Sequence, residues 1–292
     1  MTRAIGVAVA AFVLVGCGPE RPPGPAASVG ASDNSANPVT ADSVADWSHH
    51  FADEGAVGTF VLLDTASEGA EAGRITRHNP ERAARRFSPA STSKVFNALV
   101  FLDRSVVSDP DSVFRWDGVE RSIEAWNRDH SLRSGMEVSA VWLFQRLAGR
   151  VGRDGYAETF ARQPYGSSTL ADSLELSWLD GTWRISADEQ VAFMDALRRG
   201  ALAFTEADQA TVRDVLPVLA EGPGGRVLGK TGWGLPDGEP AIGWIVGWVE
   251  RPKGDVVFAM NAEEAPGGDF DVGPGRVRIV EAVLREAGVW PD

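Results

Sequence analysis

The chain has 292 residues, of which 43% are hydrophobic, and carries a formal net charge of −13. This length and apolar content suit one large domain or two closely packed ones. The negative charge argues against nucleic acid and anionic lipid as partners, and the single cysteine excludes a disulfide within the chain.

The first sixteen residues have the pattern of a signal peptide. Arg3 precedes an apolar stretch that is too short to span a bilayer as a mature helix. The stretch ends in Leu14-Val15-Gly16-Cys17, which resembles the bacterial lipoprotein signal. We therefore expect residues 1–16 to be removed and Cys17 to become a lipidated N-terminus. The alternative is a plain secretory peptide with an incidental cysteine.

Residues 17–46 are rich in Pro, Gly, Ala, Ser and Asn and have no apolar period, which is typical of a flexible tether. A folded domain is expected over residues 47–292. The predicted location is a bacterial membrane, reached through the lipid on Cys17, with the outer membrane facing the periplasm favoured. A dimer is compatible with the sequence.

Hydrophobic periodicity predicts strands at both ends of the domain and helices between them. The predicted strands cover residues 58–64, 73–77, 226–231, 241–249 and 255–261, and the predicted helices cover 139–151, 186–199, 205–219 and 276–287. This order predicts an α+β fold in which the two terminal segments form one antiparallel sheet, flanked by helices, with a helical subdomain inserted. A cleft between these parts is the expected site.

A candidate catalytic pair, Ser91 and Lys94, lies where a buried helix is predicted to begin. Pro89 and Ala90 can open a helix, and the residues after Lys94 are apolar on nearly every side. At a spacing of three, the two side chains share one helical face beside the free N–H groups of the helix start. A nucleophile, a base and an anion-stabilising terminus would then lie in one turn.

The use of lysine at this position is informative. Only Lys94, Lys230 and Lys253 are lysines among the 28 basic residues. Arginine cannot lose its proton in a protein, whereas burial lowers the pKa of a lysine. The alternative is an ordinary helix start with a lysine whose stem is buried and whose amine reaches solvent.

A second motif, Lys230-Thr231-Gly232, ends a predicted strand and is followed by Trp233. Lys230 and Thr231 would attract a substrate carboxylate, and Gly232 would let the substrate backbone approach closely. The amide of Trp233 could assist that of Ser91 in holding an oxyanion.

Together, Ser-x-x-Lys and Lys-Thr-Gly resemble the penicillin-recognising serine enzymes, which are the β-lactamases and penicillin-binding proteins. Ser139-Ala140-Val141 fills the third motif of that group, and its valine resembles class D, the oxacillinase type. The resemblance extends from about residue 47 to 289. It also includes Pro89-Ala90-Ser91-Thr92, Trp116-Asp117-Gly118, Trp126-Asn127-Arg128-Asp129-His130, Tyr165-Gly166 and Gly243-Trp244-Ile245-Val246-Gly247.

The resemblance implies hydrolysis of penicillin-type β-lactams through an acyl-Ser91 intermediate. In class D enzymes the motif lysine reacts with carbon dioxide, and the resulting carbamate is the base for both steps. Lys94 is therefore expected to be N-carboxylated, with no other cofactor. Val141 and Trp178 would form the carbamate pocket.

Further roles follow from the same resemblance. Ser139 would relay a proton toward the lactam nitrogen, with Lys230 close by. Arg276 matches the arginine that holds the carboxylate of the drug, and Arg278 is its rival for that role. Three positions depart from the family pattern, namely Ser93, Ser167 and Trp233, and they put rate and substrate range in question rather than reaction class.

No metal site is expected, and the adjacent pair His49 and His50 is interpreted as surface residues rather than as a zinc site. The histidines, which are His49, His50, His78 and His130, lack metal-ligand spacing supported by a second cluster. The carboxylates between the second and third motifs, which are Asp172, Glu175 and Asp180, are expected to be solvated loop charges rather than bases.

Two other functions were weighed. One is a penicillin sensor or cell-wall peptidase of the same fold, in which Ser91 is acylated but released slowly; such sensors normally follow transmembrane helices and a protease domain. The other is a non-catalytic lipoprotein that binds peptidoglycan with a retired site. Loss of catalytic activity in such a protein is usually accompanied by loss of a motif residue, yet all three motifs are intact.

Overall fold

A computed structural model describes residues 42–65, 73–236 and 238–291. The predicted signal peptide, Cys17 and the tether up to residue 41 lie outside these residues. Within the described part, no helix has the length and apolar character needed to cross a membrane.

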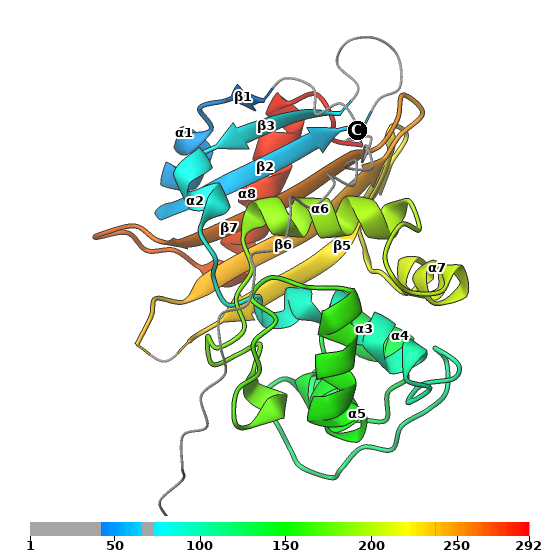
Figure 1. Ribbon diagram of the computed structural model, residues 1–292. Helices are drawn as coiled ribbons and strands as arrows, with labels where there is room; N and C mark the ends of the chain where they lie inside the picture. Colours follow the sequence, from blue (N-terminus) through cyan, green and yellow to red (C-terminus); the bar gives the residue numbers. More distant parts are fainter. Residues whose placement is uncertain (1–41, 66–72, 237, 292) are drawn as a thin grey trace, which may run out of the picture. The chain divides into compact units, whose positions relative to one another are not determined.

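A single seven-stranded sheet forms the centre of the described part (Figure 1). Its strands are β1 (Ser43–Val44), β2 (Ala56–Asp64), β3 (Arg74–His78), β4 (Val218–Gly222), β5 (Gly225–Gly234), β6 (Ile242–Glu250) and β7 (Val256–Glu264). Their order is β1-β3-β2-β7-β6-β5-β4, and the neighbours are antiparallel except β1 and β3. Because β2 pairs with β7, the two terminal segments do form one sheet, as expected.

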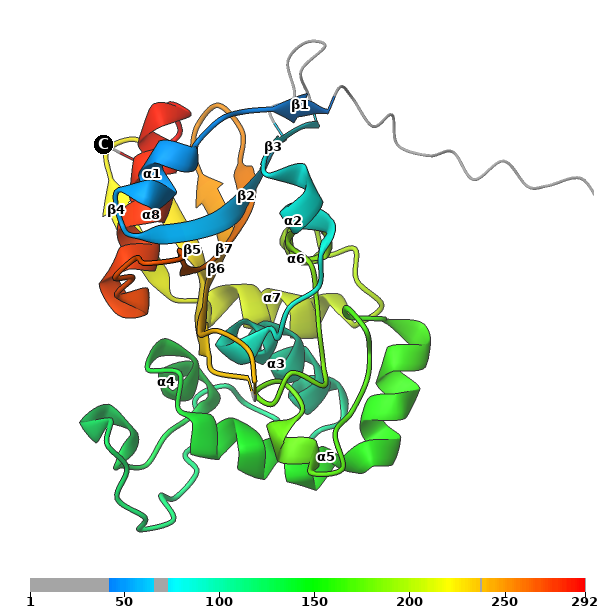
Figure 2. The same ribbon diagram turned by 90° about the vertical axis from the view of Figure 1, so that its left-hand side faces the viewer.

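Helices cover both faces of this sheet. The helices are α1 (Ser48–Ala52), α2 (Pro80–Ala84), α3 (Lys94–Asp103), α4 (Leu132–Glu137), α5 (Val141–Arg162), α6 (Ala187–Arg198), α7 (Glu206–Asp214) and α8 (Val272–Glu286). Short 3-10 turns are η1 (Ala90–Ser93), η2 (Glu124–Trp126) and η3 (Leu174–Leu176). α1 and α8 lie on one face and α6 on the other, and α3 to α5 form the inserted helical part (Figures 1 and 2).

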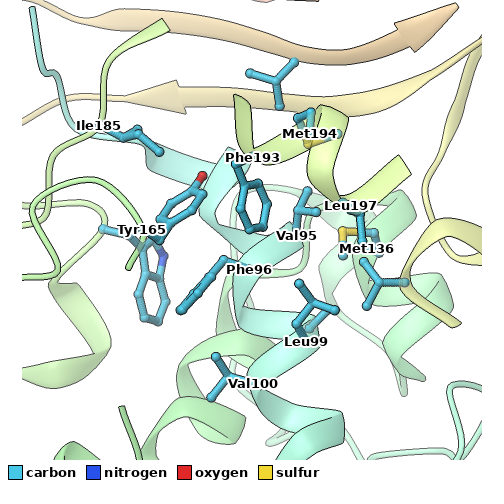
Figure 3. Packing of buried hydrophobic residues seen from close by; sticks show 14 of the residues in the cluster. Val95, Phe96, Leu99, Val100, Met136, Tyr165, Ile185, Phe193, Met194 and Leu197 are labelled. Atoms are coloured by element: carbon cyan, nitrogen blue, oxygen red, sulfur yellow. The ribbon is translucent and has the colours of Figure 1, made fainter. Parts of the chain in front are cut away.

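The core of the helical part is organised around α3. Its residues from Lys94 to Phe101 are all buried, as the apolar run predicts. Phe96 stacks against Tyr165 with ring centroids 5.0 Å apart, and its neighbours close around it from α6 and the 165–185 loop (Figure 3). The helix that follows Ser91 is thereby fixed on every side.

Several predicted boundaries were wrong. The closing helix begins at Val272 rather than at residue 276, and the helix predicted over 139–151 continues past a kink at Gly152 to Arg162. The helix predicted over residues 205–219 ends at Asp214, and residues 218–222 form β4 instead. Pro217 has no N–H and disfavours a helical residue before it, which explains the break. The helix predicted from Ser139 begins at Val141, and Ser139 itself has a left-handed φ of 59°.

The start of the folded part also differs from the expectation. Ser43 and Val44 form β1 and pair with Thr76 and Arg77 of β3. Ordered contacts therefore begin inside the segment that the sequence assigned to the tether, a few residues before residue 47.

Candidate active site

Ser91 lies in η1, a 3-10 turn that leads directly into α3. The sequence placed it in the first turn of an α-helix, so the position is close but the turn is tighter. Ala90, the preceding residue, has a φ of 47°, a left-handed conformation that is unusual for a side chain with a Cβ. Backbone strain of this kind is characteristic of functional turns.

The Nζ of Lys94 lies 2.8 Å from the Oγ of Ser91. Lys94 is fully buried, and its amine also lies 5.1 Å from the centre of the Phe144 ring. Burial, together with the nearby positive charge of Lys230, holds the pKa of Lys94 well below its usual range. A neutral amine in contact with the serine hydroxyl is able to act as a base.

A buried hydrogen-bond chain holds the turn in place. The Tyr165 hydroxyl donates to the side-chain oxygen of Gln190 at 2.9 Å, and the Gln190 amide donates to the Thr92 hydroxyl at 2.8 Å. The Thr92 hydroxyl in turn donates to the carbonyl of Pro89 at 2.7 Å. Every link is buried, so the chain connects α6 and the 165 loop to the backbone of the turn.

Strand β5 packs directly against this turn. A Cβ added to Gly232 would lie 3.1 Å from Thr92 Cγ2 and 3.2 Å from the carbonyl of Pro89. The sequence assigned Gly232 to the approach of a substrate. The close approach that the structure shows is instead between β5 and the turn that carries Ser91.

Lys230 is 1% exposed, and its amine donates to the carbonyl of Thr231 at 3.0 Å. Burial, followed by the charge of Arg276, lowers the pKa of Lys230 to about 7. Its charge is near enough to Lys94 to lower the pKa of that residue as well. The two motif lysines therefore form one electrostatically coupled pair.

Ser139 lies just before α5, and its left-handed backbone directs the chain into the helix. Its Oγ is buried and has no hydrogen-bond partner within the described residues. Val141, two residues later, lines the same cleft as Ser91 and Ser139. The Ser139-Ala140-Val141 motif thus presents to the cleft a hydroxyl without a partner among the described residues and an apolar neighbour.

Trp178 is fully buried, and its indole Nε1 also has no partner among the described residues. The Ser88 hydroxyl donates to the Trp178 carbonyl at 3.0 Å, which ties the loop of Trp178 to the segment before Ser91. Buried polar groups without a partner are rare in folded proteins. The indole N–H of Trp178 is therefore a buried donor whose acceptor is not supplied by the described residues.

The two rival arginines of α8 have different surroundings. Arg276 lines the cleft, and its guanidinium donates to the carbonyl of Gly232 at 2.5 Å. Burial lowers its pKa to about 10, and its Nε lacks a partner in the described part of the chain. Arg278 instead pairs with Glu54 at the surface. The geometry thus favours Arg276 as the carboxylate-binding residue.

The cleft has a volume of about 520 Å³. Its residues come from the three motifs, from α8 and from two loops, and they are Ser91, Ile123, Trp126, Glu137, Val138, Ser139, Val141, Leu179, Thr231, Trp233, Leu235 and Arg276. Trp233 and Leu235 are 55% and 74% exposed, so the rim is apolar. The sequence did not predict five of these residues, because they lie on loops and near helix ends whose path no periodicity reveals; they are Ile123, Glu137, Val138, Leu179 and Leu235.

Ser93 and Ser167 satisfy local backbone groups. The Ser93 hydroxyl donates to the carbonyl of Ala90, and Ser167 Oγ accepts from the backbone N–H of Arg184. Asp172, Glu175 and Asp180 are absent from the residues that line the cleft.

The histidines are distributed as follows. The ring of His130 is buried between Ser134 and the carbonyl of Ala125. His49 and His50 both contact Glu286 of α8, a juxtaposition that their sequence spacing did not reveal.

Comparison with known proteins gives consistent similarities. Residues 58–285 match the family model described as the penicillin binding protein transpeptidase domain. Beta-lactamase OXA-20 from Pseudomonas aeruginosa is 36% identical over 246 residues, which cover 84% of this chain and 88% of the relative. Beta-lactamase OXA-48 from Klebsiella pneumoniae is also 36% identical, with coverages of 84% and 89%.

Solved structures give the same result. The class D beta-lactamase FUS-1 (OXA-85) from Fusobacterium nucleatum matches with a TM-score of 0.76 and 31% identity, over 83% of this chain and 97% of the other. The C-terminal domain of the BlaR penicillin receptor from Bacillus licheniformis matches with a TM-score of 0.79 and 30% identity, over 87% and 100%.

Proposed function

Since this chain belongs to the penicillin-binding transpeptidase family and, within it, is a class D serine β-lactamase, we propose that it hydrolyses penicillins through an acyl-Ser91 intermediate. The observation that carries the proposal is the 2.8 Å approach of the fully buried Lys94 amine, whose pKa is lowered by burial, to the Ser91 hydroxyl. That contact supplies the activated nucleophile which opening of a lactam ring requires.

The acylation step uses the residues around the cleft. Ser91 Oγ attacks the lactam carbonyl carbon while its proton passes to the base at Lys94. The backbone N–H groups of Ser91 and Trp233 are proposed to hold the oxyanion. As the C–N bond breaks, the lactam nitrogen takes a proton relayed through Ser139, which lines the cleft and whose Oγ has no partner among the described residues. Water then hydrolyses the Ser91 ester and releases the penicilloate.

Lys94 is proposed to be N-carboxylated. When present, the carbamate supplies a carboxylate-type base at the position of the amine. Three features support this modification: burial lowers the pKa of Lys94, Val141 lines the same cleft as Ser91, and the indole N–H of Trp178 is a buried donor without a partner among the described residues. The neutral amine is the form that reacts with carbon dioxide.

Substrate orientation is assigned to α8 and β5. Arg276 and Thr231 both line the cleft and would bind the substrate carboxylate, Arg276 through its planar guanidinium. Gly232 and Trp233 continue the same strand, and Trp233 would contact the substituents of the drug from the rim.

The experiment uses the purified full-length protein and ampicillin, with and without added bicarbonate. We expect many turnovers per chain, a higher rate with bicarbonate, and no acylation of the Ser91→Ala variant. A single stoichiometric burst would instead support slow release, as in a receptor. Lys253→Ala is a matched control for lysine variants, because Lys253 is exposed and outside the motifs.

For location, we propose that residues 1–16 are a cleaved lipoprotein signal and that the lipid on Cys17 anchors the enzyme to the outer membrane, facing the periplasm. The sequence Leu14-Val15-Gly16-Cys17 supports this proposal. Fractionation of cells that express the parent or Cys17→Ala tests it. The parent should be found with outer-membrane markers and the variant in the soluble fraction; an unchanged distribution would contradict the anchor.

A further inference from the structure

Three metal-binding side chains meet on the face of the sheet that carries α1 and α8. His49 and His50 are neighbours on α1, and Glu286 ends α8. One ligand atom from each lies within 4.8 Å of the others. Because 236 and 237 residues separate the glutamate from the two histidines, only the fold brings the three together.

Both histidine nitrogens contact the same oxygen of Glu286. The Nε2 of His49 lies 3.0 Å from Glu286 Oε2, and the Nε2 of His50 lies 2.7 Å from the same oxygen. In a tetrahedral zinc site with bonds of about 2.0–2.1 Å, neighbouring donors are roughly 3.3 Å apart. The triad therefore needs only small side-chain adjustments to surround an ion.

The chemistry of the donors selects the ion. Two imidazole nitrogens and one carboxylate oxygen form a ligand set that suits zinc and related transition cations, rather than magnesium or calcium. The exposed fractions of the side chains, 54% for His49 and 45% for Glu286, leave a path for entry and room for a water as fourth ligand.

We propose that His49, His50 and Glu286 form a surface binding site for a divalent transition cation such as zinc. This proposal departs from the expectation of no metal drawn from the sequence alone, and the three residues are not among those that line the cleft. It would join α1, at the start of the folded part, to the C-terminal end of α8. That helix also carries Arg276, ten residues or roughly 15 Å earlier along its axis.

The test is calorimetric titration of zinc chloride into the untagged full-length protein, previously stripped with chelator and transferred to a buffer that does not bind zinc. One zinc per chain is expected. Mutation of a residue that only hydrogen-bonds to a metal ligand weakens metal binding by about 10- to 100-fold. Glu286→Gln changes a ligand itself, so it should weaken zinc binding at least as much. His49→Ala/His50→Ala should abolish stoichiometric binding. The melting temperature of the parent should rise with zinc concentration.

Glu281→Gln is the matched control, because Glu281 lies on the same helix and pairs with Arg285. It should bind zinc like the parent. Visible absorption of the cobalt-loaded protein provides a second readout that is independent of hydrolysis, so failure here and failure of the proposed function are distinguishable. Equal binding by the parent and both site variants, or no binding by the parent up to millimolar zinc, would overturn the proposal. Glu286→Gln keeps the size and polarity of the side chain, so it remains informative if the double variant does not fold.

Discussion

Lys94 and Ser91 are in contact inside the protein, with the lysine amine 2.8 Å from the serine Oγ and the lysine side chain entirely shielded from solvent. An isolated buried ammonium would be costly, and the pKa of Lys94 is correspondingly lowered. The arrangement sacrifices stability in order to keep a base beside a nucleophile.

Lys94→Ala tests this relationship directly. General-base catalysis contributes about 10²–10⁴-fold, so the acylation rate should fall by that order and deacylation should be lost as well. Stopped-flow measurement of ampicillin turnover and mass spectrometry of the acyl-enzyme separate the two steps. Lys253→Ala should match the parent. Deacylation of Lys94→Ala at the parental rate would disprove the assignment of Lys94 as base.

The second lysine makes stability depend on pH. The folded pKa of Lys230 is about 7, whereas an unfolded lysine titrates near 10.5. Between these two pKa values Lys230 is protonated in the unfolded chain and neutral in the folded protein. The free energy of unfolding therefore rises with pH in this range because of Lys230. The free energy of unfolding of the parent minus that of Lys230→Met should therefore increase by up to about 1.4 kcal/mol per pH unit between pH 7 and 10.5. Urea unfolding at pH 7.5, 8.5 and 9.5 measures it, and a flat difference would rule out the lowered pKa.

Two fully buried tryptophans allow the carbamate to be examined with a matched loss of ring volume. Trp178→Phe removes an N–H that has no partner among the described residues, so its stability cost should be limited to the lost ring volume, while turnover becomes slower and more dependent on bicarbonate. Trp183→Phe loses the same ring volume and also an N–H that donates to the carbonyl of Tyr165 at 2.8 Å, and should cost about 1–3 kcal/mol more. Hydrolysis rates across a bicarbonate series, together with thermal unfolding, distinguish the two. A Trp178→Phe variant with parental bicarbonate dependence would argue against the modification.

The arginines of α8 are a matched pair. Arg276→Ala should raise KM for ampicillin by about 10- to 100-fold, which corresponds to the loss of a charged hydrogen bond of about 1.5–3 kcal/mol. Arg278→Ala removes only a surface pair with Glu54 and should leave KM unchanged. Steady-state kinetics on both variants show which arginine binds the substrate carboxylate. Equal KM values would mean that the carboxylate binds elsewhere.

The hydrogen-bond chain behind the catalytic turn can be broken at Gln190. Gln190→Leu would leave the hydroxyls of Tyr165 and Thr92 without their buried partner, at a cost of about 2–4 kcal/mol. Gln145→Leu loses a single 3.3 Å hydrogen bond and should cost about 1 kcal/mol or less. Urea unfolding compares the variants. If kcat of Gln190→Leu falls while KM holds, the residue positions the turn; unchanged kcat would make it purely structural.

Sequence reasoning reached the parts of the site that depend on local spacing. Ser91 and Lys94 are three residues apart and the helix after them is apolar, so their contact follows from helical geometry. The five strands were also predicted within a few residues, because alternation and turn residues mark them. The Ser186–Glu189 capping box is present at the start of α6.

What the sequence could not supply depends on contacts between distant segments. The left-handed backbone of Ser139, the packing of Gly232 on the catalytic turn and the path of the loop to Trp178 are all set by tertiary neighbours. The meeting of His49, His50 and Glu286 belongs to the same category. Short elements such as β1 and α2 have too few residues to show a period.

The missing Cβ of Gly232 has a bearing on how this enzyme can evolve. With the strand close to Thr92 and Pro89, an added methyl group at Gly232 would require the turn that carries Ser91 or the strand to shift by a few tenths of an ångström, so the sheet side of the site tolerates fewer substitutions. Ile123, Trp233 and Leu235 face solvent and can vary at little structural cost. Selection by new antibiotics should therefore act first on these rim residues, and resistance variants should accumulate there before they appear beneath the serine.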